Sequence, residues 1–362
     1  MKTFAVSEVK DLLAVYGRSF FDEQENVLYT NWSASTVAMC FEGTALDVQL
    51  VADHSFEFEG PPMDPNAPRR PTWPVVAVFV DDNAEPVKVV KLEHKNQTVR
   101  LWESEAPETH RIRLTKLTEN NKTFLGIAGF TMEGQLLQAD KKGKKRLEIV
   151  GDSITCGYGN LVNDPGRHFW SAEEDGWNAY GPRAARKLGM EFSCISVSGI
   201  TAVKHAGWMI GHSMDELYSY TDRIMEEKLG REPAAWDFEK NPNDYVVVNL
   251  GTNDCFGILF SPEQGELEAF PAAYEAFIRQ IRRCNGPDTQ IICALGNMNY
   301  YLYHEIAEVA KKLRQEGDEK LHLLRFKPIH PFDGLGADGH PAMPTHIKMA
   351  EELAAFIENI EK

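Results

Sequence analysis

The sequence of 362 residues has no long apolar run and no excess of positive charge. A membrane-spanning helix needs about 18 or more consecutive apolar residues, so nothing in the sequence is predicted to cross a membrane. Lysine and arginine number 38 against 54 aspartates and glutamates, which gives a formal net charge of −16. Because nucleic acids and anionic lipids attract basic surfaces, this balance predicts neither a nucleic acid nor a membrane as a partner.

Cysteine is also scarce, and its spacing follows no disulfide or metal pattern. The six cysteines are Cys40, Cys156, Cys194, Cys255, Cys284 and Cys293. Scattered cysteines fit reduced, buried thiols better than a disulfide framework or a zinc site, and no His-Glu-x-x-His motif is present. We therefore expect no metal and no other cofactor. The start of the chain places Glu8, Lys10 and Asp11 where a secretory signal needs an unbroken apolar core, which predicts a cytoplasmic protein.

Residues from about Tyr29 to Met132 form short segments rich in β-forming side chains, separated by clusters of turn residues. The segments are TVAMCF, ALDVQLVA, PVVAVFVDD, QTVRLWE, HRIRLTKL and TFLGIAGFTM. Such alternation is typical of a β-sandwich or barrel, and we predict an all-β sandwich domain over residues 1–137. The insert from Phe58 to Pro74 is expected to be a long surface loop. The basic segment QADKKGKKR, residues 138–146, is expected to be a solvated linker.

From residue 147 to residue 362, apolar strands alternate with segments of helical length. The predicted strands are LEIVGDS, EFSCISVSG, DYVVVNLGTND, QIICALG and LHLLRF. The predicted helices are Trp177 to Leu188, MDELYSYTDRIMEEK, PAAYEAFIRQIRRC, HEIAEVAKKLRQEG and THIKMAEELAAFIENI. This alternation predicts an α/β domain whose parallel sheet is covered by helices on both faces. Functional sites in such sheets lie at the carboxyl ends of the strands.

Residues suited to acyl transfer stand at these strand ends or before the last helix. Ser153 could act as a nucleophile if His340 takes its proton during attack. The developing oxyanion needs hydrogen-bond donors, which the N–H groups of Ser153 and Gly199 and the side-chain amide of Asn253 could supply. Asp338 precedes His340 by two positions, so in an extended loop its carboxylate could reach the second imidazole nitrogen. The sequence thus predicts a serine hydrolase with the chain order Ser, Asp, His.

Several of these residues also have a structural interpretation. Ser153 alone would equally fit a helix N-cap, and only its combination with the other three segments favours catalysis. We expect Asp152 and Asp254 to accept backbone N–H groups and hold their turns. GHSMD, residues 211–215, resembles a G-x-S-x-G nucleophile elbow but lacks the last glycine and a preceding strand. Its Ser213 is expected to open a helix as part of a capping box.

The segments GDSIT (residues 151–155), SVSGIT with Gly199, GTND with Asn253 and DGHP with His340 resemble, in this order, the four blocks of the SGNH or GDSL hydrolase superfamily. The resemblance implies a three-layer, flavodoxin-like hydrolase domain. It also implies Ser153 as the nucleophile and His340 as the base. The oxyanion hole would consist of Ser153, Gly199 and Asn253.

The domain order resembles that of carbohydrate esterase family two. The resemblance rests on NWSASTVAMCFEGTALDVQL (residues 31–50), VFVDD and GDSITCGYG. It implies an N-terminal jelly roll and an acetyl esterase acting on plant polysaccharides. The spacing of Asp338 and His340 fits that family, although Gly339 stands where the family typically has tryptophan, so a wall of the acyl pocket is expected from elsewhere. Some members work as a Ser-His dyad, which leaves the role of Asp338 open.

Aromatic and amide side chains near the strand ends are candidates for binding sugar rings. They are Trp208, Asn299, Tyr300, Trp177 and Trp73. From the resemblance we expect a serine esterase that removes acetyl groups from manno- or xylo-oligosaccharides of hemicellulose, short enough to be imported. Two other functions stay open, namely a lipid-directed esterase or thioesterase on the same fold and a carbohydrate-binding protein with weak catalysis. The sequence does not set the oligomeric state.

Overall fold

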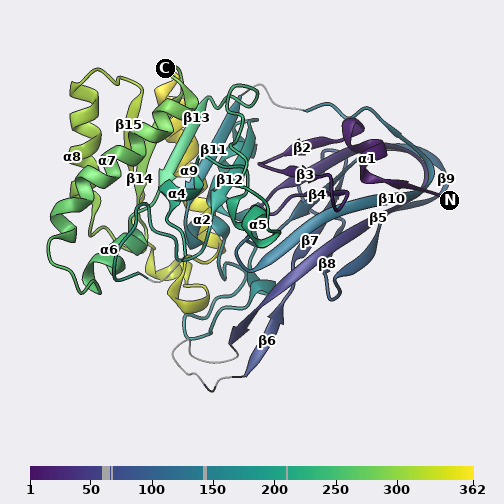
Figure 1. The fold of residues 1–362 in the computed structure, drawn as a ribbon, viewed down its shortest axis with the longest axis horizontal. Helices are drawn as coiled ribbons and strands as arrows, with labels where there is room; N and C mark the ends of the chain where they lie inside the picture. Colours follow the sequence, from purple (N-terminus) through teal and green to yellow (C-terminus); the bar gives the residue numbers. More distant parts are fainter. Residues whose placement is uncertain (59–65, 67, 142–144, 209–210) are drawn as a thin grey trace.

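The computed structural model describes residues 1–58, 66, 68–141, 145–208 and 211–362. These residues form two domains that lie side by side (Figure 1). The N-terminal domain, drawn in purple and blue, consists mainly of strands and is called the β-domain below. The C-terminal domain, drawn from teal to yellow, has a sheet with helices around it and is called the α/β-domain. No helix among the described residues is both long enough and apolar enough to span a bilayer.

The β-domain is an antiparallel sheet system with the strand order β3-β4-β10-β5-β9-β7-β8. Strand β1 pairs with β10, whereas β2 and β6 pair with β5. An apolar core lies inside these strands and includes side chains of β4, β5, β7, β9, β10 and helix α1. The elements are β1 (Lys2–Ala5), α1 (Val6–Val9), β2 (Ala14–Tyr16), β3 (Phe20–Asp22), β4 (Val27–Tyr29), β5 (Thr36–Phe58), β6 (Arg69–Thr72), β7 (Val75–Val80), β8 (Lys88–Lys91), β9 (Asn96–Lys116) and β10 (Thr123–Leu137).

Strands of the β-domain are longer than the sequence predicts. TVAMCF and ALDVQLVA belong to one strand, β5, and QTVRLWE and HRIRLTKL belong to one strand, β9. A register shift between Gly43 and Ala45, where β5 pairs with β9, marks a bulge, which bends a strand without ending it. The expected loop from Phe58 to Pro74 contains strand β6, paired with the end of β5. Residues 59–65 and 67 of that loop, and 142–144 of the expected linker, lie outside the described residues.

The α/β-domain holds a parallel sheet in the order β12-β11-β13-β14-β15. In chain order this is 2-1-3-4-5, the flavodoxin-like order. The strands are β11 (Arg146–Gly151), β12 (Glu191–Ser196), β13 (Tyr245–Asn249), β14 (Gln290–Leu295) and β15 (Leu321–Arg325). The helices are α2 (Ser153–Cys156), α3 (Tyr180–Lys187), α4 (Met214–Leu217), α5 (Arg223–Lys228), α6 (Thr252–Leu259), α7 (Glu266–Asn285), α8 (Tyr303–Gln315) and α9 (Met343–Ile360).

Alternate side chains of each strand reach opposite faces of this sheet and build two cores. On β13, Val246 and Val248 join the core that contains residues of α7 and α8. Tyr245 and Val247, on the same strand, join the core that contains residues of α3 and α9. Helices thus cover both faces, which explains why the strands are continuous apolar runs. The predicted three-layer α/β-domain after an all-β domain is confirmed.

The predicted helix MDELYSYTDRIMEEK is interrupted and forms the two short helices α4 and α5. Between them, the carbonyls of Tyr218 and Tyr220 accept hydrogen bonds from the Arg18 guanidinium of the β-domain. A continuous helix would use these carbonyls for its own backbone. Asp222 then caps α5 by accepting the N–H of Met225. The predicted strand DYVVVNLGTND ends at Asn249, and its last three residues begin helix α6, which the sequence pattern does not predict.

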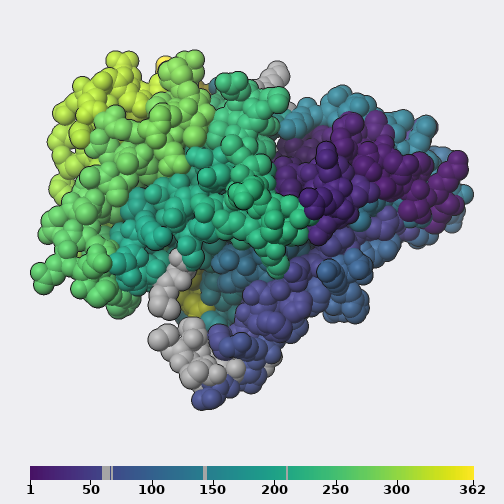
Figure 2. Space-filling model, viewed as in Figure 1, coloured from purple at the N-terminus to yellow at the C-terminus, as the bar shows by residue number. Residues whose placement is uncertain are grey.

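The two domains share a buried contact. Trp32 of the β-domain is 1% exposed, belongs to a core of the α/β-domain and donates to the Thr221 carbonyl at 2.9 Å. Figure 2 shows the N-terminal segment in purple lying against the green segment that carries α5. At this contact Asp22 pairs with Arg231 at 2.8 Å. The β-domain is therefore packed into the α/β-domain and is not only tethered to it.

Candidate active site

Ser153 is the first residue of α2, directly after strand β11. The preceding residue, Asp152, caps α2 by accepting the Ile154 N–H at 3.0 Å, as the sequence predicts. A side chain on Gly151 would come within 2.0 Å of Thr155 Oγ1, so the close turn requires glycine there. Burial raises the pKa of Asp152 to about 7. This turn holds Ser153 at the carboxyl edge of the sheet.

His340 lies in the loop before α9 and contacts Ser153 directly. Its Nε2 atom is 2.9 Å from Ser153 Oγ, although the two residues are 187 positions apart. Burial lowers the pKa of the imidazole to about 4, so His340 is neutral at pH 7. A neutral Nε2 at hydrogen-bond distance can accept the serine proton during attack.

The Asp338 carboxylate bonds to residues other than His340, which corrects the sequence expectation. His340 Nδ1 instead lies 3.2 Å from the Ala337 carbonyl, a backbone acceptor. The Asp338 carboxylate accepts the Tyr158 hydroxyl at 2.8 Å and the Phe169 N–H at 3.0 Å. The expectation assumed an extended loop, whereas Asp338 has a φ of +50°, so residues 338 and 340 do not share a side. The backbone, and not a carboxylate, therefore orients His340.

Tyr158 is a site residue that no sequence pattern marks. Its ring centroid is 4.1 Å from that of His340 and 3.8 Å from that of Phe169. Its hydroxyl holds Asp338, whose carboxylate also contacts His168 Nδ1 at 3.1 Å. Burial raises the pKa of Asp338, but these hydrogen bonds outweigh burial and hold it below its ordinary value. Tyr158 stands in the GYG segment, which reads as a turn, and it fixes the loop that presents His340.

The candidate oxyanion donors come from three segments. Within the described part of the chain, neither the Ser153 nor the Gly199 N–H donates a hydrogen bond. Gly199 has a φ of +79°, a conformation that favours glycine. Asn253 Nδ2 lies 2.9 Å from the Ile200 carbonyl and 3.4 Å from Asp152 Oδ2. The second contact is long and therefore weak, so the amide keeps a donor for an oxyanion beside the nucleophile.

Asp254, next to Asn253, braces this region as the sequence predicts. It accepts the Ala202 N–H at 2.9 Å and lies 3.1 Å from His205 Nε2. Glu266 lies 2.7 Å from the other nitrogen of His205. Burial lowers the pKa of His205, but the two carboxylates outweigh burial and raise it above its ordinary value. The imidazole thus joins the loop after β12 to the starts of α6 and α7.

Two of the five predicted sugar-binding residues lie beside the oxyanion donors. Trp208 Nε1 donates to the Gly199 carbonyl at 2.7 Å. Asn299 Nδ2 donates to the carbonyl of Thr252, the residue before Asn253, at 3.3 Å. Both side chains are therefore bonded to the backbone of segments that carry the candidate oxyanion donors.

The other three predicted sugar-binding residues have different surroundings. Trp177 is 4% exposed and packs against Phe79 in a core between the domains, so the expectation that it contacts substrate is wrong. Trp73 lines a separate cavity of about 380 Å³ together with Trp170. Tyr300 donates to the Phe326 carbonyl at 2.8 Å, which ties its hydroxyl to the backbone after β15.

Two exposed phenylalanines continue the surface beside Trp208. Phe256 and Phe260 are 41% and 68% exposed. The Trp208 and Phe256 rings are nearly parallel with centroids 6.4 Å apart, and the Phe256 and Phe260 rings follow at 6.2 Å. Both phenylalanines lie on the helix face of Asn253, three and seven positions later. We call these three rings the aromatic strip. The sequence did not reveal it, because no helix was predicted over residues 252–259 and the spacing of the two phenylalanines along one face was therefore not recognised.

The GHSMD segment is a helix start, as the sequence predicts. The Ser213 N–H donates to Glu216 Oε2 at 3.0 Å, and the Ser213 hydroxyl donates to the same atom at 3.1 Å. Ser213 is therefore engaged in opening helix α4.

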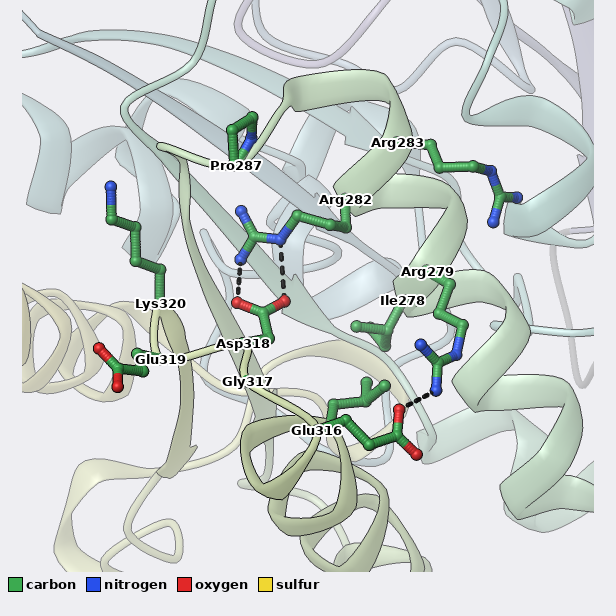
Figure 3. A pocket seen from close by; sticks show the side chains of 11 residues that line it. Ile278, Arg279, Arg282, Arg283, Pro287, Glu316, Gly317, Asp318, Glu319 and Lys320 are labelled. Carbon is green, nitrogen blue, oxygen red and sulfur yellow. Dashed lines mark hydrogen bonds and ion pairs between the residues drawn. The ribbon is translucent and has the colours of Figure 1, made fainter.

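A cavity of about 590 Å³ lies away from this site, between α7, α8 and the start of β15 (Figure 3). Arg282 faces Asp318 with two contacts of 2.9 and 2.8 Å, and Arg279 pairs with Glu316. These paired charges hold the two helices together. The residues that line the cavity include no serine or cysteine nucleophile, so it offers no second acyl-transfer site.

Comparison with known proteins matches both domains. Residues 149–346 match the GDSL-like lipase/acylhydrolase family, and residues 15–139 match the carbohydrate esterase 2 N-terminal family. The chain is 30% identical to the cellulase/esterase CelE of Acetivibrio thermocellus over 91% of its own length, but it spans only 37% of that protein. It is 27% identical to an acetylxylan esterase / glucomannan deacetylase of Cellvibrio japonicus, covering 98% of this chain and 93% of that protein.

A solved structure has the same two-domain fold. It is a family two carbohydrate esterase from Clostridium thermocellum in complex with cellohexaose. The TM-score is 0.81 at 29% sequence identity, covering 96% of this chain and 98% of that chain. The expected resemblance of both domains, which rested on short motifs, is therefore confirmed over nearly the whole chain.

Proposed function

The chain belongs to the GDSL-like lipase/acylhydrolase family and shares both domains with family two carbohydrate esterases, and from this premise we propose that it removes acetyl groups from hemicellulose oligosaccharides. The observation that carries the proposal is the 2.9 Å contact between Ser153 Oγ and the neutral His340 imidazole. The relative named acetylxylan esterase / glucomannan deacetylase supports acetylated xylo- and manno-oligosaccharides as substrates.

In the proposed reaction, Ser153 Oγ attacks the acetyl carbonyl carbon while His340 Nε2 takes the hydroxyl proton. The N–H groups of Ser153 and Gly199 and the amide of Asn253 stabilise the oxyanion. The intermediate collapses when the imidazolium gives its proton to the leaving sugar oxygen, and the acetyl group stays on Ser153. His340 then takes a proton from water, which attacks the acetyl-enzyme. Acetate leaves as the imidazolium returns the proton to Ser153 Oγ. The Ala337 carbonyl supports the imidazolium in both steps.

The sugar backbone is proposed to lie on the aromatic strip, with Asn299 beside the acetyl group. Ligand sites combine apolar and aromatic surface with a few placed polar groups, and this surface has both. Asn253 and Phe260 are seven helix positions apart, so the strip runs about 10 Å from the oxyanion donors. A neutral oligosaccharide is also compatible with the net charge of −16. Longer oligosaccharides are therefore expected to bind more tightly than acetylated monosaccharides.

The test is the variant Ser153→Ala. Mass spectrometry measures how fast acetylated xylo- and manno-oligosaccharides lose their acetyl groups. We expect a loss of about a thousand-fold or more, because the nucleophile of the covalent step is removed. Ser213→Ala is the matched control, since Ser213 also stands in a Gly-x-Ser context but opens helix α4. Activity retained in Ser153→Ala would overturn the proposal.

A lipid-directed esterase is the second candidate, because the exposed side chains of Phe256, Leu259 and Phe260 would also accept an apolar acyl chain. Hydrolysis of p-nitrophenyl acetate and p-nitrophenyl octanoate separates the two functions, and we expect the acetate to be preferred. A carbohydrate-binding protein with weak catalysis is less well supported, because Ser153 and His340 are in contact.

A cytoplasmic location remains part of the proposal and is supported by six cysteines that are all unpaired.

A further inference from the structure

We propose that Glu119 of the β-domain is a positioning residue for the oxyanion hole of the α/β-domain. This inference rests on the proposed esterase function. Glu119 lies between β9 and β10 and is 0% exposed. It contributes no atom to the candidate reaction centre and acts on that centre through the backbone of the loop after β12.

The Glu119 carboxylate touches both segments that carry the reaction centre. Its Oε2 atom accepts the N–H of Ser198, the residue before Gly199, at 2.7 Å. The same oxygen lies 3.8 Å from Sγ of Cys156, the last residue of the helix that Ser153 begins. One oxygen of the β-domain thus connects the nucleophile helix to the loop that supplies the Gly199 N–H.

Four of the contacts that hold the loop after β12 lie close to Gly199, and of these four Glu119 supplies the one from the other domain. The Ile200 N–H closes a turn onto the Val197 carbonyl at 3.2 Å. Trp208 holds the Gly199 carbonyl, and Asn253 holds the Ile200 carbonyl. The bond from Ser198 to the carboxylate fixes the peptide just before Gly199, and a bond to a charged acceptor is stronger than one between neutral groups. Removing it releases the peptide that precedes the oxyanion donor.

Two lysine side chains contact Glu119, and one of them faces its carboxylate. Lys122 Nζ lies 3.2 Å from Glu119 Oε1, and the buried Lys116 donates to the Glu119 carbonyl at 2.7 Å. Glu174 accepts the Glu119 N–H at 2.9 Å. Burial, and then the nearby Glu119 charge, raise the pKa of Glu174 well above its ordinary value. One carboxylate oxygen of Glu119 therefore faces the Lys122 ammonium, and the other serves as a fixed acceptor for the Ser198 N–H.

A metal site is the rival interpretation, because Glu119, Cys156 and Glu174 lie close enough to share an ion. Two features argue against it. The Lys122 ammonium already contacts Glu119 Oε1, and a cation beside it would be repelled. Burial raises the pKa of Cys156 well above its ordinary value, so an ion would have to displace the thiol proton at a cost before it could bind there. The cluster is better explained as a brace between the domains.

The test compares Glu119→Ala and Glu119→Gln with Asn120→Ala in the full chain. Asn120 is the matched control, because it is the next residue, is also 0% exposed and also bonds across the domains, but to Asp222. For each variant, kcat and KM are measured on p-nitrophenyl acetate and on an acetylated xylo-oligosaccharide, and thermal unfolding is followed separately. One oxyanion donor is worth about 10²–10³ in kcat, and a displaced donor loses part of this.

We expect Glu119→Ala to lower kcat about ten-fold or more with KM changed less than about two-fold. Glu119→Gln keeps a carbonyl acceptor for Ser198 and is expected to recover part of kcat. Asn120→Ala is expected to lower the unfolding temperature but to leave kcat near that of the parent. If Glu119→Ala fails to fold, Glu119→Gln decides by the same comparison with Asn120→Ala.

Unchanged kcat in the Glu119 variants, or the same loss in Asn120→Ala, would overturn the inference. A rise in KM alone would also overturn it, because the oxyanion donors act on the transition state. These results leave the proposed function standing, since the parent chain is active in each. A parent chain without esterase activity would instead overturn the proposed function, and this inference with it.

Discussion

In the α/β-domain the candidate catalytic residues follow strands of one parallel sheet or lie in the loop before α9. The β-domain reaches the same place through the loop between β9 and β10, two strands of an antiparallel sheet. The first domain presents groups that react, namely the Ser153 hydroxyl and the His340 imidazole. The second presents buried charges, Arg18 and Glu119, that bind backbone groups of the first. Chemistry and support are therefore divided between the domains, and substitutions on the two sides should affect different measurements.

The Arg18–Glu148 pair gives the largest effect expected on the support side. Both side chains are 0% exposed. Burial alone raises the pKa of Glu148, but Arg18 outweighs burial and holds it below its ordinary value. Arg18→Met leaves this carboxylate buried without its partner, which costs about 3 to 5 kcal/mol. We expect that loss in the free energy of unfolding, measured by urea denaturation, and kcat of the folded protein within about two-fold of the parent.

Lys228→Met is the matched control for this substitution. Lys228 and Asp53 also pair across the domains, at 2.6 Å, but their side chains are 37% and 44% exposed. Breaking an exposed pair is expected to cost less than about 1 kcal/mol. A large loss of kcat in Arg18→Met at a temperature where the protein is folded would contradict the division between support and chemistry.

Asp338→Asn is expected to have an intermediate effect on kcat. It tests the reactive groups of the α/β-domain, whereas Arg18→Met tests the support from the β-domain. A carboxylate that orients the catalytic histidine is worth about 10⁴ in kcat in a Ser-His-Asp triad. Here the Ala337 carbonyl contacts Nδ1, and the hydrogen bonds of the Asp338 carboxylate go to other residues of the site. Asparagine tolerates the positive φ of this position, so the loop is kept. We expect kcat on p-nitrophenyl acetate to fall less than about ten-fold.

Asp333→Asn, earlier in the same loop, is the control for Asp338→Asn, since Asp333 pairs with the exposed Lys348. It is expected to leave kcat unchanged. A fall of three or more orders of magnitude in Asp338→Asn alone would show that the carboxylate acts on His340 during the reaction.

The pH dependence between neutral and mildly acidic pH is the smallest effect expected. The reaction needs neutral His340, and burial lowers the pKa of this imidazole to about 4. The neutral form therefore persists as pH falls and is lost only through pH values near 4. Protonation of His340 is therefore expected to leave kcat/KM on p-nitrophenyl acetate nearly constant from about pH 7.5 to about 5.5 and to halve it near pH 4, whereas a step near pH 7 would report Asp152.

Activity regained on return to pH 7 would separate this titration from acid unfolding. A midpoint near 6.5, the ordinary value for histidine, would show that the imidazole is not buried as described. Such a midpoint would weaken the assignment of the reactive groups to a site closed by Tyr158.

The α/β-domain could be predicted from the sequence because its signals are local. Apolar runs alternate with amphipathic segments, and the residues after each run converge where parallel strands end. Ser153, Gly199, Asn253 and His340 follow from this placement. The geometry of Asp338 could not be predicted, because its positive φ is held by tertiary contacts with Tyr158 and Phe169.

The β-domain was harder to predict because tertiary contacts, and not local sequence patterns, decide its features. Gly43 reads as the end of a strand, whereas β5 continues through a bulge there. Glu119 stands in the polar segment TENNK, which is what an exposed turn looks like, and only its burial against the loop after β12 gives it a role. Trp177 looked like a surface aromatic for sugars, but packing between the domains buries it.

The Ala337 carbonyl beside His340 has a consequence for how this site can change over generations. A carboxylate at that place is encoded by one codon, and a single base change can remove it. A peptide carbonyl is present in every residue, so no substitution at position 337 deletes the acceptor, provided that the backbone keeps its course. Ala337 is buried against Gly159, so only a small side chain fits at position 337. This limits the size of the side chain and does not require a particular functional group. Orientation of the base is thereby shielded from most point mutations.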